Sequence, residues 1–117
     1  MGVRYLGISG EMAARDYLTG LGAQILGMNV VSAGVEIDII ALIDDVIAFI
    51  EVKRRSSARF GRPAEAVTPA KMRRIIRGAE AYLAHNALTD RPVRFDVIEI
   101  LPGEIKHIPG AFDASRW

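Results

Sequence analysis

Asp38, Glu51 and Lys53 are spaced so that a β-hairpin would bring their charged groups together. If the aspartates at 44–45 form a two-residue turn, paired residues of the two strands have numbers that sum to 89. Asp38 then lies opposite Glu51, with the two Cβ atoms roughly 5 Å apart. By the same count Glu36 lies opposite Lys53, and all these charged side chains point to one face of the hairpin.

Two opposed carboxylates at the end of an apolar face need a proton or a cation between them, because they repel each other and lose hydration. The rest of that face is apolar and consists of Ile40, Leu42, Ile47 and Phe49. Oxygen ligands favour a hard divalent ion such as Mg2+ or Mn2+, which leaves positions open for water and a phosphate oxygen. The pattern therefore predicts Asp38 and Glu51 as metal ligands, with Lys53 within reach of whatever the metal holds.

The same side chains could instead form a structural salt-bridge cluster at a strand end. The register of the hairpin is decisive, because a loop one residue longer or shorter would put Asp38 and Glu51 on opposite faces. Asp-Asp is not the Asn-Gly type of turn that favours a two-residue loop. A four-residue loop would leave the pairing intact.

The net charge is +1, but the basic residues are concentrated in residues 53–77. This segment holds nine of the 15 basic residues and one acidic residue, Glu65, which gives it a net charge of +8. The nine are Lys53, Arg54, Arg55, Arg59, Arg62, Lys71, Arg73, Arg74 and Arg77. A basic block beside a carboxylate pair suggests a polyanionic partner, most commonly a nucleic acid backbone. The alternatives are a solvated basic face and a basic helix that docks an acidic protein.

The elements that would position these residues are a helix, three strands, a second helix and two strands. We place them at 9–21, 23–30, 35–43, 46–52, 69–85, 93–101 and 104–108, with Ser9 and Thr68 as helix caps. Because the second and third strands are apolar on both faces, helices must cover the sheet on both sides. The expected fold class is α/β, with a mixed five-stranded sheet flanked by helices.

Glu11 lies at the N-terminal end of the apolar stripe of the first predicted helix, which consists of Ala14, Tyr17, Leu18 and Leu21. An acid on this stripe points toward the core or toward a cleft, so Glu11 is a further candidate for the site. The alternative is that a glutamate in the first turn only complements the helix dipole.

At 117 residues and 50% hydrophobic content, the chain is expected to form a single domain over residues 1–117. The absence of cysteine excludes disulfides, thiolate metal sites and cysteine nucleophiles, and it suits a reducing cytoplasm. No signal segment or membrane span is visible, so we expect a soluble cytoplasmic protein with no membrane partner. His85 and His107 lack the spacing of a histidine metal site. Phe112 and Trp117 are expected to serve packing or an interface rather than base stacking.

An acid on one strand followed by Glu-x-Lys on the next, here Asp38 and Glu51-Val52-Lys53, is the constellation of the PD-(D/E)XK nucleases. Over nearly its full length the chain also resembles the YraN family of uncharacterised bacterial proteins. That family is similar to archaeal Holliday junction resolvases and has a restriction-endonuclease-like fold. The resemblance runs through Gly10-Glu11 with Ala14 and Tyr17-Leu18, Asn29, Glu36-Ile37-Asp38, Phe49 to Lys53 with Arg55, Phe60-Gly61, Glu65-Ala66-Val67, Lys71, Arg94-Phe95-Asp96-Val97, and His107-Ile108 with Ala111-Phe112.

The chain departs from the pattern of that family at three positions. Met28 and Val31 stand where arginines are usual, and Val35 stands where a glycine is usual. Loss of two arginines near the cleft would weaken phosphate binding. Gly34, just before Val35, could absorb the turn.

The resemblance implies a magnesium-dependent endonuclease that hydrolyses DNA phosphodiester bonds, with branched, Holliday-junction-like DNA as a candidate substrate. In this scheme Asp38 and Glu51, with the Val52 carbonyl, hold Mg2+ or Mn2+ against the scissile phosphate. Lys53 orients the attacking water or stabilises the developing charge, and Glu11 completes the site.

The remaining charged residues have supporting roles in the same scheme. Glu36 orients Lys53 rather than binding the metal, and the basic residues from Arg54 to Arg77 contact phosphates, which position a duplex without reading its sequence. An exposed apolar C-terminal segment would support a homodimer, which a four-way junction favours by symmetry. Because two arginines are missing, the alternative is a nucleic-acid-binding module that keeps the fold but cuts nothing.

Overall fold

The computed structural model describes residues 10–55 and 67–114. Its elements follow one another as α2 (Gly10–Gly20), β1 (Gln24–Ser32), β2 (Val35–Ile43), β3 (Val46–Arg54), α3 (Pro69–His85), β4 (Val93–Leu101) and β5 (Glu104–Phe112). The order of elements is as predicted, and β2, α3 and β4 have the predicted bounds. β5 runs past its predicted end at 108, because an edge strand tolerates Pro109 and its last residue still pairs with β4.

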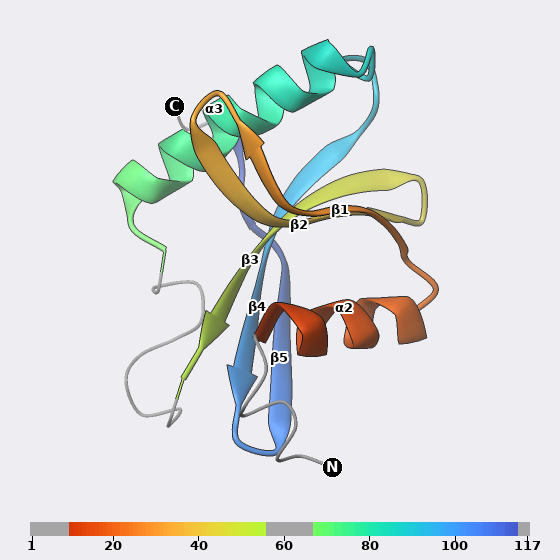
Figure 1. Ribbon diagram of the computed structural model, residues 1–117, viewed down its shortest axis with the longest axis vertical. Coiled ribbons are helices and arrows are strands. Elements are labelled where there is room, and N and C mark those ends of the chain that lie inside the picture. The colour runs from red at the N-terminus through yellow and green to blue at the C-terminus, as the bar shows by residue number, and fades with distance from the viewer. Residues whose placement is uncertain (1–9, 56–66, 115–117) are drawn as a thin grey trace.

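The strands form one mixed sheet in the order β1-β2-β3-β4-β5 (Figure 1). Neighbouring strands are antiparallel except for β3 and β4, which are parallel. A parallel pair needs a crossover connection, and α3 lies in the segment that joins these two strands. The α/β fold class, with an open mixed five-stranded sheet and flanking helices, is therefore confirmed.

Each face of the sheet is covered by its own hydrophobic core. On the α3 side, Phe49 stacks on Phe95 with ring centroids 5.6 Å apart, and both belong to one cluster with Ile75 of α3. On the α2 side, Leu18 of the helix packs in a cluster with Ile50 of β3. This two-sided burial explains why β2 and β3 are apolar on both faces. No helix in the described parts of the chain is long and apolar enough to cross a membrane.

The β2–β3 turn has two residues, as the predicted register requires. Asp44 and Asp45 have positive φ angles of 49° and 67°, the left-handed conformation that both central residues of a type I′ turn adopt. Aspartate tolerates this region better than most residues, because its short polar side chain can bond to nearby backbone. The strand pairs run from Ile43–Val46 to Ile39–Ile50, so the numbers of paired residues sum to 89.

Beyond Ile39 and Ile50 the two strands separate. β2 continues as a hairpin with β1, and Figure 1 shows the tip of this hairpin reaching α3, where the Ser32 hydroxyl donates to the Gly78 carbonyl oxygen at 2.7 Å. β3 instead continues along β4. The expected placement of Glu36 opposite Lys53 is therefore not found, because Glu36 pairs with a residue of β1.

Candidate functional site

Asp38 and Glu51 lie where β2 and β3 separate, one residue beyond the last ladder pair, Ile39 and Ile50. The Val52 N–H donates to Oδ2 of Asp38 at 2.8 Å, so a side-chain oxygen takes the place of a backbone acceptor at the point of separation. The Glu51 carboxyl group is close enough to Asp38 to act on its pKa.

The pKa of Asp38 is raised from 3.8 to about 7. Burial is the largest cause, and the charges of Glu51 and Glu11 raise the pKa further, whereas the hydrogen bond from the Val52 N–H lowers it. Glu11, in the first turn of α2, is therefore close enough to the pair to act on it electrostatically. Carboxyl groups from α2, β2 and β3 thus lie close enough to influence one another electrostatically.

Glu51 contacts two lysines. Its side chain is only 4% exposed, and its Oε2 lies 3.3 Å from Nζ of Lys53 and 3.1 Å from Nζ of Lys71. Lys71 belongs to the first turn of α3, and its sequence context indicated only a role in phosphate contact. The one sequence signal for an acidic partner of Lys71 is its position in the first turn of a helix, where the helix dipole disfavours positive charge.

The donor set of Asp38 and Glu51 fits a hard divalent cation. Within residues 10–55 and 67–114, no three carboxylate or histidine side chains form a group that could hold a metal ion. Mg2+, however, is commonly bound through one or two carboxylates and keeps several waters, so a pair of carboxylates is sufficient. A cation here would also relieve the repulsion that raises the pKa of Asp38. These two residues would hold the metal, with Glu11 beside them.

The predicted phosphate-contacting residues lie in several places. Arg59 and Arg62 fall outside the described residues. Arg54 packs its side-chain stem near Gly10 of α2. The basic side chains on the outer face of α3 are exposed, and they are Arg73, Arg74 and Arg77.

Arg55 has a partner that the sequence did not indicate. Its Nε lies 3.0 Å from Oε2 of Glu99, a carboxylate of β4 whose side chain is 2% exposed. The parallel pairing of β3 with β4 sets Glu99 beside Lys53 in the register. Glu99 in turn pairs with Lys106 of β5, so a base, an acid and a base lie side by side across β3, β4 and β5.

A second polar cluster, on the α2 side, centres on the fully buried Asp96. Arg94 Nε donates to its two oxygens at 3.0 and 3.1 Å, the Gly110 N–H donates at 3.0 Å and His107 Nε2 donates at 2.8 Å. The Nδ1 atom of His107 lies 3.1 Å from the Tyr17 hydroxyl. Burial alone would raise the pKa of Asp96, but these hydrogen bonds, the one from His107 foremost, outweigh it and lower the pKa. The cluster ties α2 to β4 and β5.

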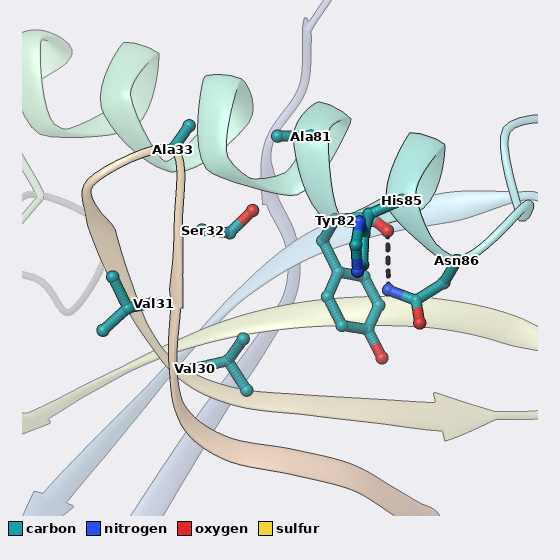
Figure 2. A pocket seen from close by; sticks show the side chains of 8 residues that line it. All are labelled: Val30, Val31, Ser32, Ala33, Ala81, Tyr82, His85 and Asn86. Carbon is teal, nitrogen blue, oxygen red and sulfur yellow. Dashed lines mark hydrogen bonds between the residues drawn. The ribbon is translucent and has the colours of Figure 1, made fainter.

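A pocket of about 450 Å³ lies away from the carboxylates, between the β1–β2 hairpin and the C-terminal half of α3 (Figure 2). Its lining residues are Val30, Val31, Ser32, Ala33, Ala81, Tyr82, His85 and Asn86. None of these is an acid or a lysine, and the Asn86 side-chain amide already donates to the Tyr82 carbonyl oxygen at 2.8 Å. The pocket therefore lacks the groups that phosphate chemistry requires.

The raised pKa of Asp38 makes the stability of the metal-free protein depend on pH. Because the folded protein holds this proton more tightly than the unfolded chain, the stabilising contribution of the protonated Asp38 is fully present below the unfolded pKa of 3.8 and is lost as the pH rises through about 7. We expect the stability of Asp38→Asn relative to wild type to increase by roughly 2 kcal/mol between about pH 5 and pH 8. Urea unfolding in the presence of a chelator measures this difference, and parallel pH profiles of the two proteins would contradict it.

The comparison with known proteins gives a consistent family. The uncharacterised protein family UPF0102 matches residues 10–100. A UPF0102 protein of Symbiobacterium thermophilum is 47% identical over 86% of this chain and 85% of its own length. A UPF0102 protein of Clostridioides difficile is 47% identical over 88% of this chain and 92% of its own length. A UPF0102 protein of Syntrophotalea carbinolica is 41% identical over 96% of this chain and 94% of its own length. The chain therefore belongs to the uncharacterised protein family UPF0102, which is the YraN family that its motifs indicated.

Proposed function

We propose that this protein is a metal-dependent endonuclease that hydrolyses DNA phosphodiester bonds in the cytoplasm, with branched DNA as a candidate substrate. The observation that carries the proposal is the pairing of Asp38 with Glu51 beside the ammonium of Lys53. Burial and the neighbouring acids raise the pKa of Asp38 strongly, and strongly perturbed carboxylates cluster at functional sites. The mixed sheet with a helix on each face agrees with the restriction-endonuclease-like fold that the resemblance implies.

Each residue of the site has a role that its position supports. Asp38 and Glu51 would hold the metal, which when bound supplies a water of lowered pKa and neutralises charge on the phosphate. Lys53, whose Nζ is 3.3 Å from Glu51, is placed to stabilise the charge that develops on a phosphate at this site. Glu11 adds a third carboxylate from α2, and its charge reaches Asp38.

The basic residues supply the partner surface in this proposal. Arg73, Arg74 and Arg77 are exposed on α3, whose first turn reaches the site through Lys71. Exposed arginines along one helix suit contacts with a phosphate backbone, which position a nucleic acid without reading its sequence. A homodimer would match the symmetry of a four-way junction.

The direct test is cleavage by the purified, chelator-treated protein. A four-way junction and a linear duplex of the same sequence are incubated with Mg2+, with Mn2+ or with excess chelator, and nicked strands are resolved on denaturing gels. We expect nicks with either metal and none with the chelator, because the carboxylate pair has no other cation that activates water. Metal-independent nicking, or no nicking with either metal on either substrate, would contradict the proposal.

The second candidate is a nucleic-acid-binding module that does not cut. It is favoured by one observation, that Glu51 already has two ammonium partners within 3.3 Å and so is already paired without a metal. This module would bind DNA with a steep salt dependence and take up no metal by calorimetry. Metal uptake that is lost in Asp38→Asn would exclude it in favour of the nuclease.

A further inference from the structure

One oxygen of Glu51 is shared by two ammonium groups. Lys53 Nζ lies 3.3 Å and Lys71 Nζ lies 3.1 Å from Oε2. Lys53 follows Glu51 by two residues on the same strand, so its direction is set by the strand itself. Lys71 belongs to a different element, the first turn of α3, so its contact with Glu51 depends on the tertiary packing of the helix against the sheet.

The composition of the chain makes this contact unusual. Of its 15 basic residues only three are lysines, and these are Lys53, Lys71 and Lys106. Two of the three lysines contact one carboxylate oxygen, although the basic residues of the chain other than these three are all arginines. Arginine makes flat, bidentate contacts with a carboxylate, whereas lysine presents a compact point charge. A compact ammonium is the side-chain group that most resembles a small metal cation.

The position of Lys71 in its helix is unfavourable without Glu51. Its backbone N–H donates to the Thr68 side chain at the N-cap, so Lys71 lies in the first turn, where the helix dipole disfavours a cation. No acidic residue in that turn compensates for it. The lysine side chain is 36% exposed, whereas that of Glu51 is 4% exposed. The ammonium can therefore move out into solvent while the carboxylate stays in place.

We propose that Lys71 is a displaceable counter-ion of the metal site. Its ammonium occupies Glu51 in the metal-free protein and leaves when a divalent cation binds to the carboxylate pair. This inference rests on the proposed function for the existence of the metal site and adds a regulatory contact to it. The built-in cation competes with the metal, so it raises the metal concentration at which the site fills and keeps the Glu51 carboxylate ordered until then.

The first test measures metal affinity by titration calorimetry of the full chain with Mn2+ and with Mg2+. Lys71→Met removes the competing charge and keeps a good helix former of similar length, so we expect about tenfold tighter binding. Lys106→Met is the matched control, because it removes the same group from the only other lysine outside the Glu51 contact. Its affinity is expected to stay within about twofold of wild type.

The second test follows the Lys71 ammonium directly in the wild-type protein. Each of the three lysines can be assigned after partial acetylation and mass spectrometry. We expect the acetylation rate of Lys71 to rise several-fold when Mg2+ is added, because the group leaves a buried carboxylate for solvent, while the rate of Lys106 stays constant. This readout distinguishes displacement from a general electrostatic effect on affinity.

The outcomes separate this inference from the proposed function. Metal binding with unchanged affinity in Lys71→Met, or with an unchanged acetylation rate at Lys71, would overturn the counter-ion role and leave the nuclease proposal standing. Cation binding that tightens in Lys71→Met without any DNA cleavage would support the counter-ion and overturn the nuclease. If neither wild type nor Lys71→Met binds a divalent cation, both proposals fail.

Discussion

Glu51→Gln is expected to lower metal-dependent DNA cleavage by roughly 10³-fold, about 4 kcal/mol of transition-state stabilisation. Glutamine keeps the volume and one acceptor oxygen of the side chain but removes the charge that a divalent cation needs. It also removes the acid pair with Asp38, so Asp38 would lose the carboxylate with which it holds the metal. The measurement is kcat/KM for nicking of the DNA substrate at saturating Mg2+, together with Mn2+ affinity by calorimetry.

The fold should tolerate this substitution. The two lysines that lose their partner have side chains 32% and 36% exposed, so water can solvate them in its place. Asp45→Asn is the matched control, because it neutralises an exposed carboxylate at the tip of the same hairpin and asparagine also tolerates a positive φ. The control should cleave at the wild-type rate. Cleavage by Glu51→Gln within tenfold of wild type, with an intact fold by circular dichroism, would remove Glu51 from the metal site.

Binding and cleavage should respond differently to the same change. If the nuclease proposal holds, Glu51→Gln loses cleavage but keeps salt-dependent DNA binding, because the exposed arginines of α3 are untouched. In the alternative of a binding module, wild type and variant are both inactive and bind alike. The variant therefore discriminates between the two candidate functions only when binding and cleavage are measured on the same DNA.

The hairpin and α3 were predictable because their signals are local. Alternating and continuous apolar patterns set the strands, and Thr68-Pro69 sets the start of α3 within the sequence itself. The pairing of Asp38 with Glu51 followed from the length of one turn. The two-residue length of that turn depends on Asp44 and Asp45 both adopting a positive φ. Asp-Asp is a weaker sequence signal for such a turn than Asn-Gly.

The partners of the site could not be predicted, because they depend on how distant strands and helices pack. Glu99 meets Arg55 only because β3 pairs with β4 in parallel, and the sequence does not say which strand becomes that neighbour. Lys71 meets Glu51 only because the first turn of α3 packs close to β3. Glu36 was misplaced for the same reason, since the β2–β3 ladder ends at Ile39 and Ile50, and the residues of β2 before Ile39 pair only with β1.

Among these variants, a substitution at the buried Asp96 is expected to have the largest effect on stability. Asp96→Asn keeps the shape of the side chain but removes a buried charge that accepts hydrogen bonds from Arg94, His107 and Gly110. Breaking a buried, hydrogen-bonded ion pair by removing one partner typically costs about 3–5 kcal/mol, because the remaining charge is left without compensation. We expect a loss of this size in urea unfolding at neutral pH, a large fraction of the stability of a domain of this length.

The control and the pH dependence make this prediction specific to the buried site. Asp16→Asn removes an acid from an exposed pair with Arg15, whose side chains are 39% and 49% exposed, and it should cost less than about 1 kcal/mol. Because the pKa of Asp96 is lowered on folding, its stabilisation is present above the unfolded value of 3.8 and is lost as the pH falls through the folded value. The difference in free energy of unfolding between wild type and Asp96→Asn should therefore shrink as the pH falls below 3.8. A difference that stays constant through this acidic range would show that the charge of Asp96 is not its cause.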